Sequence, residues 1–187
     1  MMNLDKRQHV SCKTNSNIII SSHSVNYDLD NCLTGERLTR FNIASRSVTR
    51  DKLLRGSHFV YRALKEIGYA DEICRQAFSV ASTYQIPLPH GHISYSNSNN
   101  YHVLIYSPNG VCGVDVEEYR NRLEVVYDNL LDYQPFVDKK LAFYQTWLKK
   151  EIHFKCQSAT QVTYELFNDY LLGYFFEGNS DIIHIYL

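Results

Sequence analysis

Two charged segments about thirty residues apart contain the side chains best suited to chemistry. The first runs from Gly113 to Glu117 and alternates carboxylates with small or apolar residues. If this segment is a strand, Asp115 and Glu117 share one face, because successive side chains point to opposite sides of a sheet. Val114 and Val116 then point the other way, into a core. The pattern predicts two neighbouring carboxylates on one side of a sheet.

The second segment runs from Phe143 to Lys155 and has the spacing of an amphipathic helix. Trp147, Glu151 and Lys155 recur every four residues and therefore share a helix face. Beside that face is an apolar stripe that we expect to pack inward, formed by Leu141, Tyr144, Leu148 and Ile152. The two segments together offer three carboxylates and a lysine to one cleft.

This set of side chains is typical of a magnesium site that binds phosphates. Magnesium prefers oxygen ligands and is usually held by one or two carboxylates together with phosphate oxygens and water. A nearby lysine supplies the second cation that a pyrophosphate needs. In the alternative interpretation, Glu151 and Lys155 form an ordinary exposed ion pair, which contributes only about 0.3 to 0.5 kcal/mol.

The order of these motifs resembles the 4'-phosphopantetheinyl transferases, particularly the surfactin-synthetase-activating class, in which a single chain carries two similar halves. The motifs are Gly-Val-Asp-Val-Glu at 113–117, a spacer, and Phe-Tyr-x-x-Trp-x-x-Lys-Glu-x-x-x-Lys at 143–155. Weaker similarity extends upstream through Phe78-Ser79, Tyr84 to Pro87 and His92 to Ser96 to a helix rich in Leu and Arg at 53–64. The resemblance covers most of residues 37–155.

The resemblance implies transfer of the phosphopantetheine arm of coenzyme A to a serine of an apo acyl or peptidyl carrier protein, with release of adenosine 3',5'-bisphosphate. Asp115, Glu117 and Glu151 would then bind Mg²⁺, and Lys155 would lie beside the pyrophosphate. Either Glu151 or a metal-bound water would be the base for the carrier serine. In a displacement at phosphorus, positioning and charge neutralisation supply most of the catalysis.

The implied fold is α+β, with two similar α/β lobes related by pseudo-twofold symmetry and the site between them. We expect residues 1–109 to form the N-terminal lobe, on the nucleotide side, and 110–187 the C-terminal lobe with the magnesium site. Part of residues 1–35 is expected to be loosely ordered, because this stretch is polar and rich in Ser and Asn.

A basic region upstream is the expected partner of the nucleotide 3'-phosphate. Residues 37–65 contain eight Lys and Arg side chains and one acidic residue, Asp51. The family uses basic residues from this region, so Arg46, Arg50 and Lys52 are the candidates. For any one of them, the solvated face of a helix that ends at Gly68 is an equally good interpretation.

Ser94 and Tyr95 are further candidates for binding coenzyme A, although the sequence departs from the family here. Relatives usually have Ser-His-Ser where this chain has Ser-Tyr-Ser at 94–96, and Gly-Lys-Pro where it has Gln-Ile-Pro at 85–87. The spacer between Glu117 and Trp147 is also short. Losing two phosphate contacts would weaken coenzyme A binding by about 3 to 6 kcal/mol if nothing compensates.

Three functional hypotheses follow. The first is a magnesium-dependent holo-acyl-carrier-protein synthase acting in fatty-acid or secondary-metabolite biosynthesis. The second is a relative that binds a carrier protein or coenzyme A without transfer, and the third is a magnesium phosphohydrolase or other nucleotide-binding enzyme on a similar scaffold. The intact carboxylates and Lys155 favour the first.

The amino-acid composition agrees with a folded enzyme and argues against several other classes of protein. The chain has 187 residues, of which 44% are hydrophobic, and this is enough for a core. A net charge of −1 argues against general nucleic-acid binding. Five scattered cysteines without zinc-like spacing are interpreted as reduced thiols. Without a recognisable signal peptide or membrane span, we expect a cytoplasmic monomer.

Periodicity and turn residues predict the main elements. Helices are expected at 51–67 and 136–155. Strands are expected at 17–20, 103–106, 111–117, 170–176 and 182–186. The turn residues Pro108-Asn109-Gly110 predict that the strands on either side of them form a hairpin.

Overall fold

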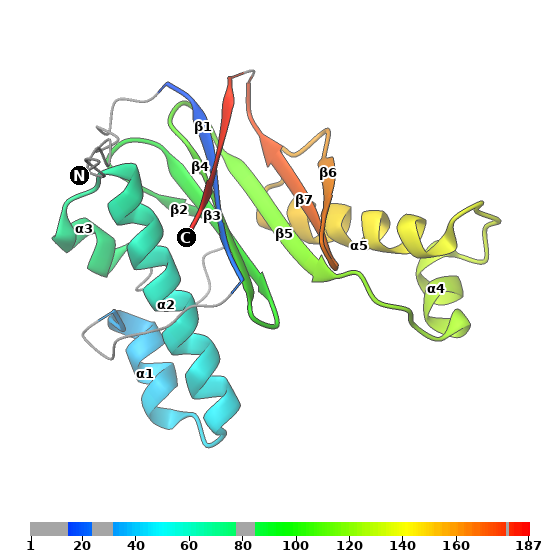
Figure 1. The fold of residues 1–187 in the computed structure, drawn as a ribbon, viewed down its shortest axis with the longest axis horizontal. Coiled ribbons are helices and arrows are strands. Elements are labelled where there is room, and N and C mark those ends of the chain that lie inside the picture. The colour runs from blue at the N-terminus through cyan, green and yellow to red at the C-terminus, as the bar shows by residue number, and fades with distance from the viewer. Residues whose placement is uncertain (1–14, 24–31, 78–84, 179) are drawn as a thin grey trace, which may run out of the picture. The chain divides into compact units, whose positions relative to one another are not determined.

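The computed structural model describes residues 15–23, 32–77, 85–178 and 180–187, which form a mixed α+β fold. The chain divides into two compact units (Figure 1). One comprises residues 1–15 and 27–81 and is helical where it is described, and the other comprises residues 16–26 and 82–187 and contains both sheets. The lobe boundary expected between residues 109 and 110 stays a prediction.

The helical unit consists of α1 (Gly35–Ile43), α2 (Ser47–Ile67) and α3 (Asp71–Gln76). The predicted helix ending at Ile67 is confirmed and begins four residues earlier than expected. It stops at Gly68, whose φ of 100° suits a residue without a Cβ. Arg37 joins α1 to α2, because its guanidinium donates to Ser57 Oγ (2.9 Å) and to the Leu53 carbonyl oxygen (3.2 Å).

A five-stranded sheet forms half of the second unit. Its strand order is β2 (Gln85–Pro87), β3 (His92–Ser98), β4 (Tyr101–Ser107), β1 (Asn17–Ser22) and β8 (Ile182–Tyr186). β8 pairs with β1 in parallel and the other pairs are antiparallel. The strand predicted at residues 17–20 is confirmed, and every residue of β1 is buried. Residues 1–14 and 24–31, part of the stretch expected to be loosely ordered, lie outside the described residues.

A three-stranded sheet forms the other half, in the order β5 (Cys112–Glu118), β7 (Tyr170–Phe176) and β6 (Thr163–Phe167). The strands predicted on either side of residues 108–110 are both confirmed, but the prediction that they pair as a hairpin is wrong. β4 already has β3 and β1 on its two edges, so β5 cannot pair with it and pairs with β7 instead. The hairpin turns lie at Asn99 and Asn168, which have φ values of 51° and 52°.

The two sheets enclose a shared apolar core. Val114 and Val116 of β5 pack in one cluster with Val103 and Ile105 of β4 and with Ile19 of β1. The prediction that these two valines point into a core is therefore confirmed. Because side chains alternate along β5, its two carboxylates project from the opposite face.

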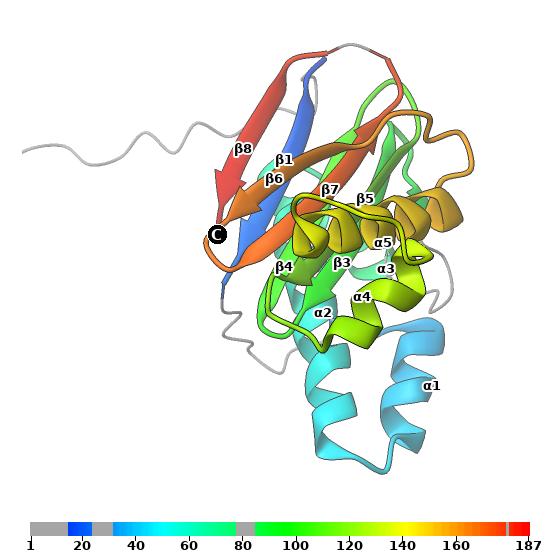
Figure 2. The same ribbon diagram turned by 90° about the vertical axis from the view of Figure 1, so that its right-hand side faces the viewer.

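Helix α5 (Lys139–Lys155) lies against that opposite face, beside β5 and β7 (Figure 2). Three residues of the predicted stripe, Tyr144, Leu148 and Ile152, are fully buried, and the fourth, Leu141, is partly buried. The helix begins at Lys139 rather than 136, because the Asp138 carboxylate accepts a hydrogen bond from the Leu141 backbone N–H (2.9 Å) and caps it.

A short helix, α4 (Glu124–Leu131), was not predicted. It packs on α5, and Lys139 links the two helices by donating to Glu124 (2.6 Å) and Asp128 (2.8 Å). Within the described residues, no helix is both long enough and apolar enough to span a membrane.

Candidate functional site

The two charged segments meet at Asp115 and Lys155. Lys155 Nζ donates to Asp115 Oδ1 (2.7 Å) and to the Val114 carbonyl oxygen (2.9 Å), which ties the last turn of α5 to the middle of β5. The side chains of Lys155 and Asp115 are only 7% and 9% exposed. The alternative interpretation of Lys155 as half of an exposed ion pair with Glu151 is therefore wrong.

Ser96 completes this contact from a third element. Its hydroxyl, on β3, donates to the same oxygen, Asp115 Oδ1, at 2.7 Å. Ser96 is 8% exposed, so the whole cluster is shielded from solvent. Hydrogen bonds from charged donors are stronger than neutral ones, and the two donors together hold the Asp115 carboxyl group in a fixed position.

Glu117 lies two residues further along β5, where the strand approaches its end. Burial raises the pKa of Glu117, and the negative charge of Asp115 raises it further. A smaller contribution in the same direction comes from Glu151 on α5. The Arg122 guanidinium, 4.0 Å from the Glu117 carboxylate, and a hydrogen bond from Trp147 oppose these effects.

Besides burial, the charges of Asp115 and Glu151 both contribute to the raised pKa of Glu117. A partly buried cluster of like charges is less stable than separated charges, and a bound dication would remove the repulsion. Their oxygen chemistry also suits Mg²⁺. Among the residues that the structure describes, however, no group of three or more Asp, Glu, His or Cys side chains is arranged to hold a metal ion. In this conformation the Lys155 ammonium, and not a metal, neutralises Asp115.

Ser94 and Tyr95 lie on the same strand as Ser96 but serve different contacts. Ser94 is fully buried, and its hydroxyl accepts a hydrogen bond from the Val114 backbone N–H (3.2 Å). Tyr95 points to the other face, where its hydroxyl lies 2.8 Å from His102 Nδ1. In this structure Ser94 joins β3 to β5, and its predicted contact with coenzyme A remains a prediction, as does that of Tyr95.

The three predicted 3'-phosphate ligands belong to the helical unit. Arg46 is the N-terminal capping residue of α2, and Arg50 and Lys52 lie in its first turns. All three are exposed, and Arg50 Nε donates to the Ala44 carbonyl oxygen (2.8 Å). Asp115, Glu117, Glu151 and Lys155 all belong to the other unit, where the structure brings them together. The three cations are not part of that group.

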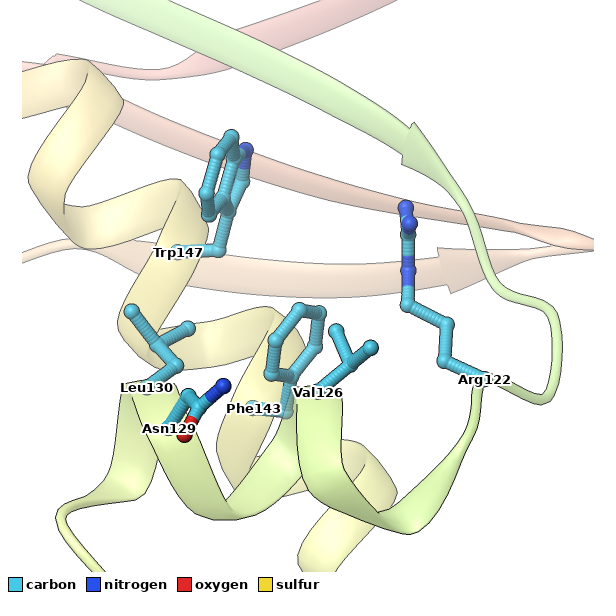
Figure 3. A pocket seen from close by; sticks show the side chains of 6 residues that line it. All are labelled: Arg122, Val126, Asn129, Leu130, Phe143 and Trp147. Carbon is cyan, nitrogen blue, oxygen red and sulfur yellow. The ribbon is translucent and has the colours of Figure 1, made fainter.

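A pocket of about 320 Å³, two of whose lining residues contact Glu117, was not found from the sequence (Figure 3). It lies between α4 and α5 and is lined by Arg122, Val126, Asn129, Leu130, Phe143 and Trp147. Two of these residues, Arg122 and Trp147, also contact Glu117. Phe143 and Trp147 belong to the motif recognised in the sequence, whereas the other four lie in the unpredicted helix α4 or just before it.

Comparison of the sequence with protein-family models and with curated proteins finds no significant match. The functional assignment therefore depends on the motifs and on the geometry of this site.

Proposed function

We propose that this protein transfers the 4'-phosphopantetheine arm of coenzyme A to a serine of an apo acyl or peptidyl carrier protein. The observation that supports this most strongly is the buried contact of Lys155 with Asp115, beside Glu117 and Glu151. This contact joins one side chain from each of the two motifs that resemble the transferase family. The two residues are 40 positions apart in the sequence.

Each residue has a role that follows from its position and charge. Asp115, Glu117 and Glu151 would hold Mg²⁺, which when bound neutralises the charge of the pyrophosphate. Lys155 adds a positive charge next to the phosphates, and its buried bond to Asp115 keeps that charge in place without the entropy cost of ordering a free lysine. Glu151 is the candidate base that accepts the proton of the carrier serine.

We propose two lobes related by pseudo-twofold symmetry, as in the family that the motifs resemble. The recurrence of antiparallel strands in both sheets supports this, since β3, β4 and β1 form one antiparallel set and β6, β7 and β5 another. Arg46, Arg50 and Lys52 are the proposed ligands of the 3'-phosphate.

A specific observation favours one alternative, a relative that binds a carrier or coenzyme A without transfer. The Lys155 ammonium already neutralises Asp115, and Tyr95 stands where the family has a phosphate-binding histidine. Ile86, at the position of the missing lysine, is only 8% exposed, so Ile86→Lys would bury an ammonium group as well as add a cation.

The experiment that tests the proposal measures the intact mass of a panel of apo carrier proteins after incubation with the protein, Mg²⁺ and coenzyme A. A mass gain equal to the phosphopantetheine arm is expected for at least one carrier. Asp115→Asn should slow this gain by about 10²- to 10³-fold, the usual effect of removing one charge-stabilising group. Coenzyme A binding measured by calorimetry, with no mass gain on any carrier, would instead favour the alternative.

A further inference from the structure

The pocket between α4 and α5 has apolar walls and a cation at one end. Helix α4 contributes Val126 and Leu130 to the walls. Helix α5 contributes the rings of Phe143 and Trp147, whose centroids lie 6.4 Å apart and whose planes differ by only 18°. Figure 3 shows Arg122 and Trp147 at opposite ends of the pocket, with Phe143 between them. The volume of about 320 Å³ is that of a small ligand site, so the walls suit the hydrocarbon part of a small molecule.

Arg122 is held in place and yet keeps most of its hydrogen-bond donors. Its Nε donates to the Tyr144 hydroxyl (3.1 Å), and its guanidinium carbon lies 5.6 Å from the ring centroid of Phe143 and 5.5 Å from that of Tyr144. An arginine side chain has five N–H donors. Within the described residues, the other four N–H groups of Arg122 donate no hydrogen bond. Arg122 therefore offers donors in a fixed position to a ligand in the pocket.

The nearby Glu117 carboxylate leaves these donors available. It lies 4.0 Å from Arg122 Nη2, whereas an N–H···O hydrogen bond spans about 2.7 to 3.2 Å. The ion pair of Asp115 with Lys155 is different, because its two atoms are in direct contact at 2.7 Å. A second carboxylate can thus bind the Arg122 guanidinium through two parallel hydrogen bonds, the geometry that arginine favours.

We propose that this pocket binds a small amphipathic monocarboxylate, whose hydrocarbon part lies between α4 and α5 and whose carboxylate accepts hydrogen bonds from Arg122. Among the described residues that line the pocket, Arg122 is the only charged one. One cation matches a ligand with a single negative charge better than a doubly charged phosphate. The inference does not depend on the proposed transfer reaction.

The test uses the fluorescence of Trp147, which is the only tryptophan in the chain and lines the pocket. The probes are octanoate, 1-octanol and octylamine, which share a hydrocarbon chain and differ in the charge of the head group. Titration of the full chain should give saturable changes, with octanoate bound about 10-fold more tightly than octanol and octylamine bound most weakly. This factor is the lower end of the contribution of a hydrogen bond to a charged group, because Arg122 is 29% exposed.

Arg122→Met removes the guanidinium and keeps an unbranched side chain for contact with Phe143 and Tyr144. It should lower the affinity for octanoate to that for octanol and leave the octanol affinity unchanged. Arg122→Lys keeps the charge without the planar fork and should give an intermediate octanoate affinity, which covers the case in which the methionine variant does not fold. Equal affinities for octanoate and octanol in the unmodified protein, or no saturable change with any probe, would overturn the inference.

Arg120→Met is the matched control. Arg120 also pairs with a glutamate, Glu118, at 3.7 Å, but it is 62% exposed and is not among the residues that line the pocket. Its replacement should leave the affinities for all three probes unchanged. Equal losses of octanoate affinity in Arg120→Met and Arg122→Met would mean that octanoate responds to general positive charge, and the inference would be wrong.

Val126→Phe tests the position of the ligand, because the larger side chain fills the pocket from α4. It should weaken the binding of octanoate and octanol alike. Undiminished binding of both probes would place the ligand elsewhere and would also overturn the inference.

Discussion

Asp115 and Lys155 form a buried ion pair, and this determines how the site behaves before any ligand binds. Taking two charges out of water is unfavourable, and their attraction offsets this only when both partners are present. Each partner makes one further hydrogen bond: Asp115 accepts one from the Ser96 hydroxyl, and Lys155 donates one to the Val114 carbonyl oxygen. Removing one partner should therefore lower the free energy of unfolding more than removing both.

Lys155→Met should destabilise the protein by about 3 to 5 kcal/mol, because it leaves the Asp115 carboxylate buried without its cation. The double variant Lys155→Met with Asp115→Asn should be more stable than the single one. Urea unfolding at pH 7 without metal measures the stability of the two single variants and of the double variant. A double variant whose loss equals the sum of the two single losses would show that the pair is not coupled.

A second prediction concerns the pH dependence that Glu117 causes. Its pKa is raised in the folded protein, so the folded state favours the protonated form, and ionisation of Glu117 at neutral pH lowers stability. Glu117→Gln removes this charge and should raise the unfolding temperature at pH 7 in the presence of EDTA. The difference should shrink as the pH falls through the raised pKa toward the ordinary value of 4.5.

Thermal unfolding of both proteins between pH 4 and pH 8 measures this difference. A stabilisation by Glu117→Gln that grew as the pH fell would contradict the assignment.

The residues of the site were partly predictable. Alternation placed Asp115 and Glu117 on one face, and the helical spacing brought Glu151 and Lys155 to it. The contact with Ser96 was not predictable, because these side chains are 19 residues apart and meet only where two sheets join. Local periodicity carries no information about which strands of different sheets become neighbours.

At the scale of elements, α5 fits against β5 and β7 because both strands have a glycine where the helix approaches. A Cβ at Gly173 would lie 2.9 Å from Ile152 Cδ1 and 3.2 Å from Leu148 Cβ. A Cβ at Gly113 would lie 3.1 Å from Ile152 Cγ2 and from Cys156 Cβ. Larger residues would push the helix, and with it Glu151 and Lys155, away from the sheet.

Gly173→Ala should destabilise the protein by about 1 to 3 kcal/mol through overpacking. Ile152→Val removes the Cδ1 methyl that the new Cβ would meet, so it should recover part of this loss in the Gly173→Ala background. The same change should not rescue Gly113→Ala, because valine retains the Cγ2 methyl. Denaturant unfolding of the single and double variants measures the coupling, and equal rescue at both glycines would contradict this packing.

The elements also show where local patterns stop being informative. The strands and the two long helices follow from apolar periodicity, whereas the hairpin predicted at residues 108–110 fails because the partner edges of β4 are occupied by distant strands. Helix α4 was missed because its eight residues are too few to establish a helical period.

At the scale of the whole molecule, the first and last described strands pair with each other. β1 and β8 lie side by side in parallel, and β1 also separates β8 from β4. Such long-range pairing depends on the complete topology, so the sequence predicted the strands without their order. Cysteine burial follows from the same topology and provides a test of it.

None of the four cysteines in the described part of the chain forms a disulfide, and three of them, Cys74, Cys112 and Cys156, are buried. Burial raises the pKa of the Cys74 thiol to about 11 and also raises that of Cys112. Since the thiolate is the reactive form, alkylation of the native protein at pH 8 should leave Cys74 and Cys112 unmodified. Cys156 should also stay unmodified, because burial denies the reagent access to it.

All three should react fully in urea, and peptide mass mapping assigns the modified sites. Rapid labelling of native Cys112 would contradict the core between the two sheets.

In the function proposed here, the chain couples the loss of coenzyme A to the modification of a carrier serine. The most direct measurement quantifies both products in one reaction, adenosine 3',5'-bisphosphate by chromatography and the modified serine peptide by tandem mass spectrometry. We expect equal amounts of the two products, in a reaction that requires Mg²⁺ and is strongly slowed in Asp115→Asn. Release of the bisphosphate without a carrier, or carrier modification that persists undiminished in Asp115→Asn, would contradict it.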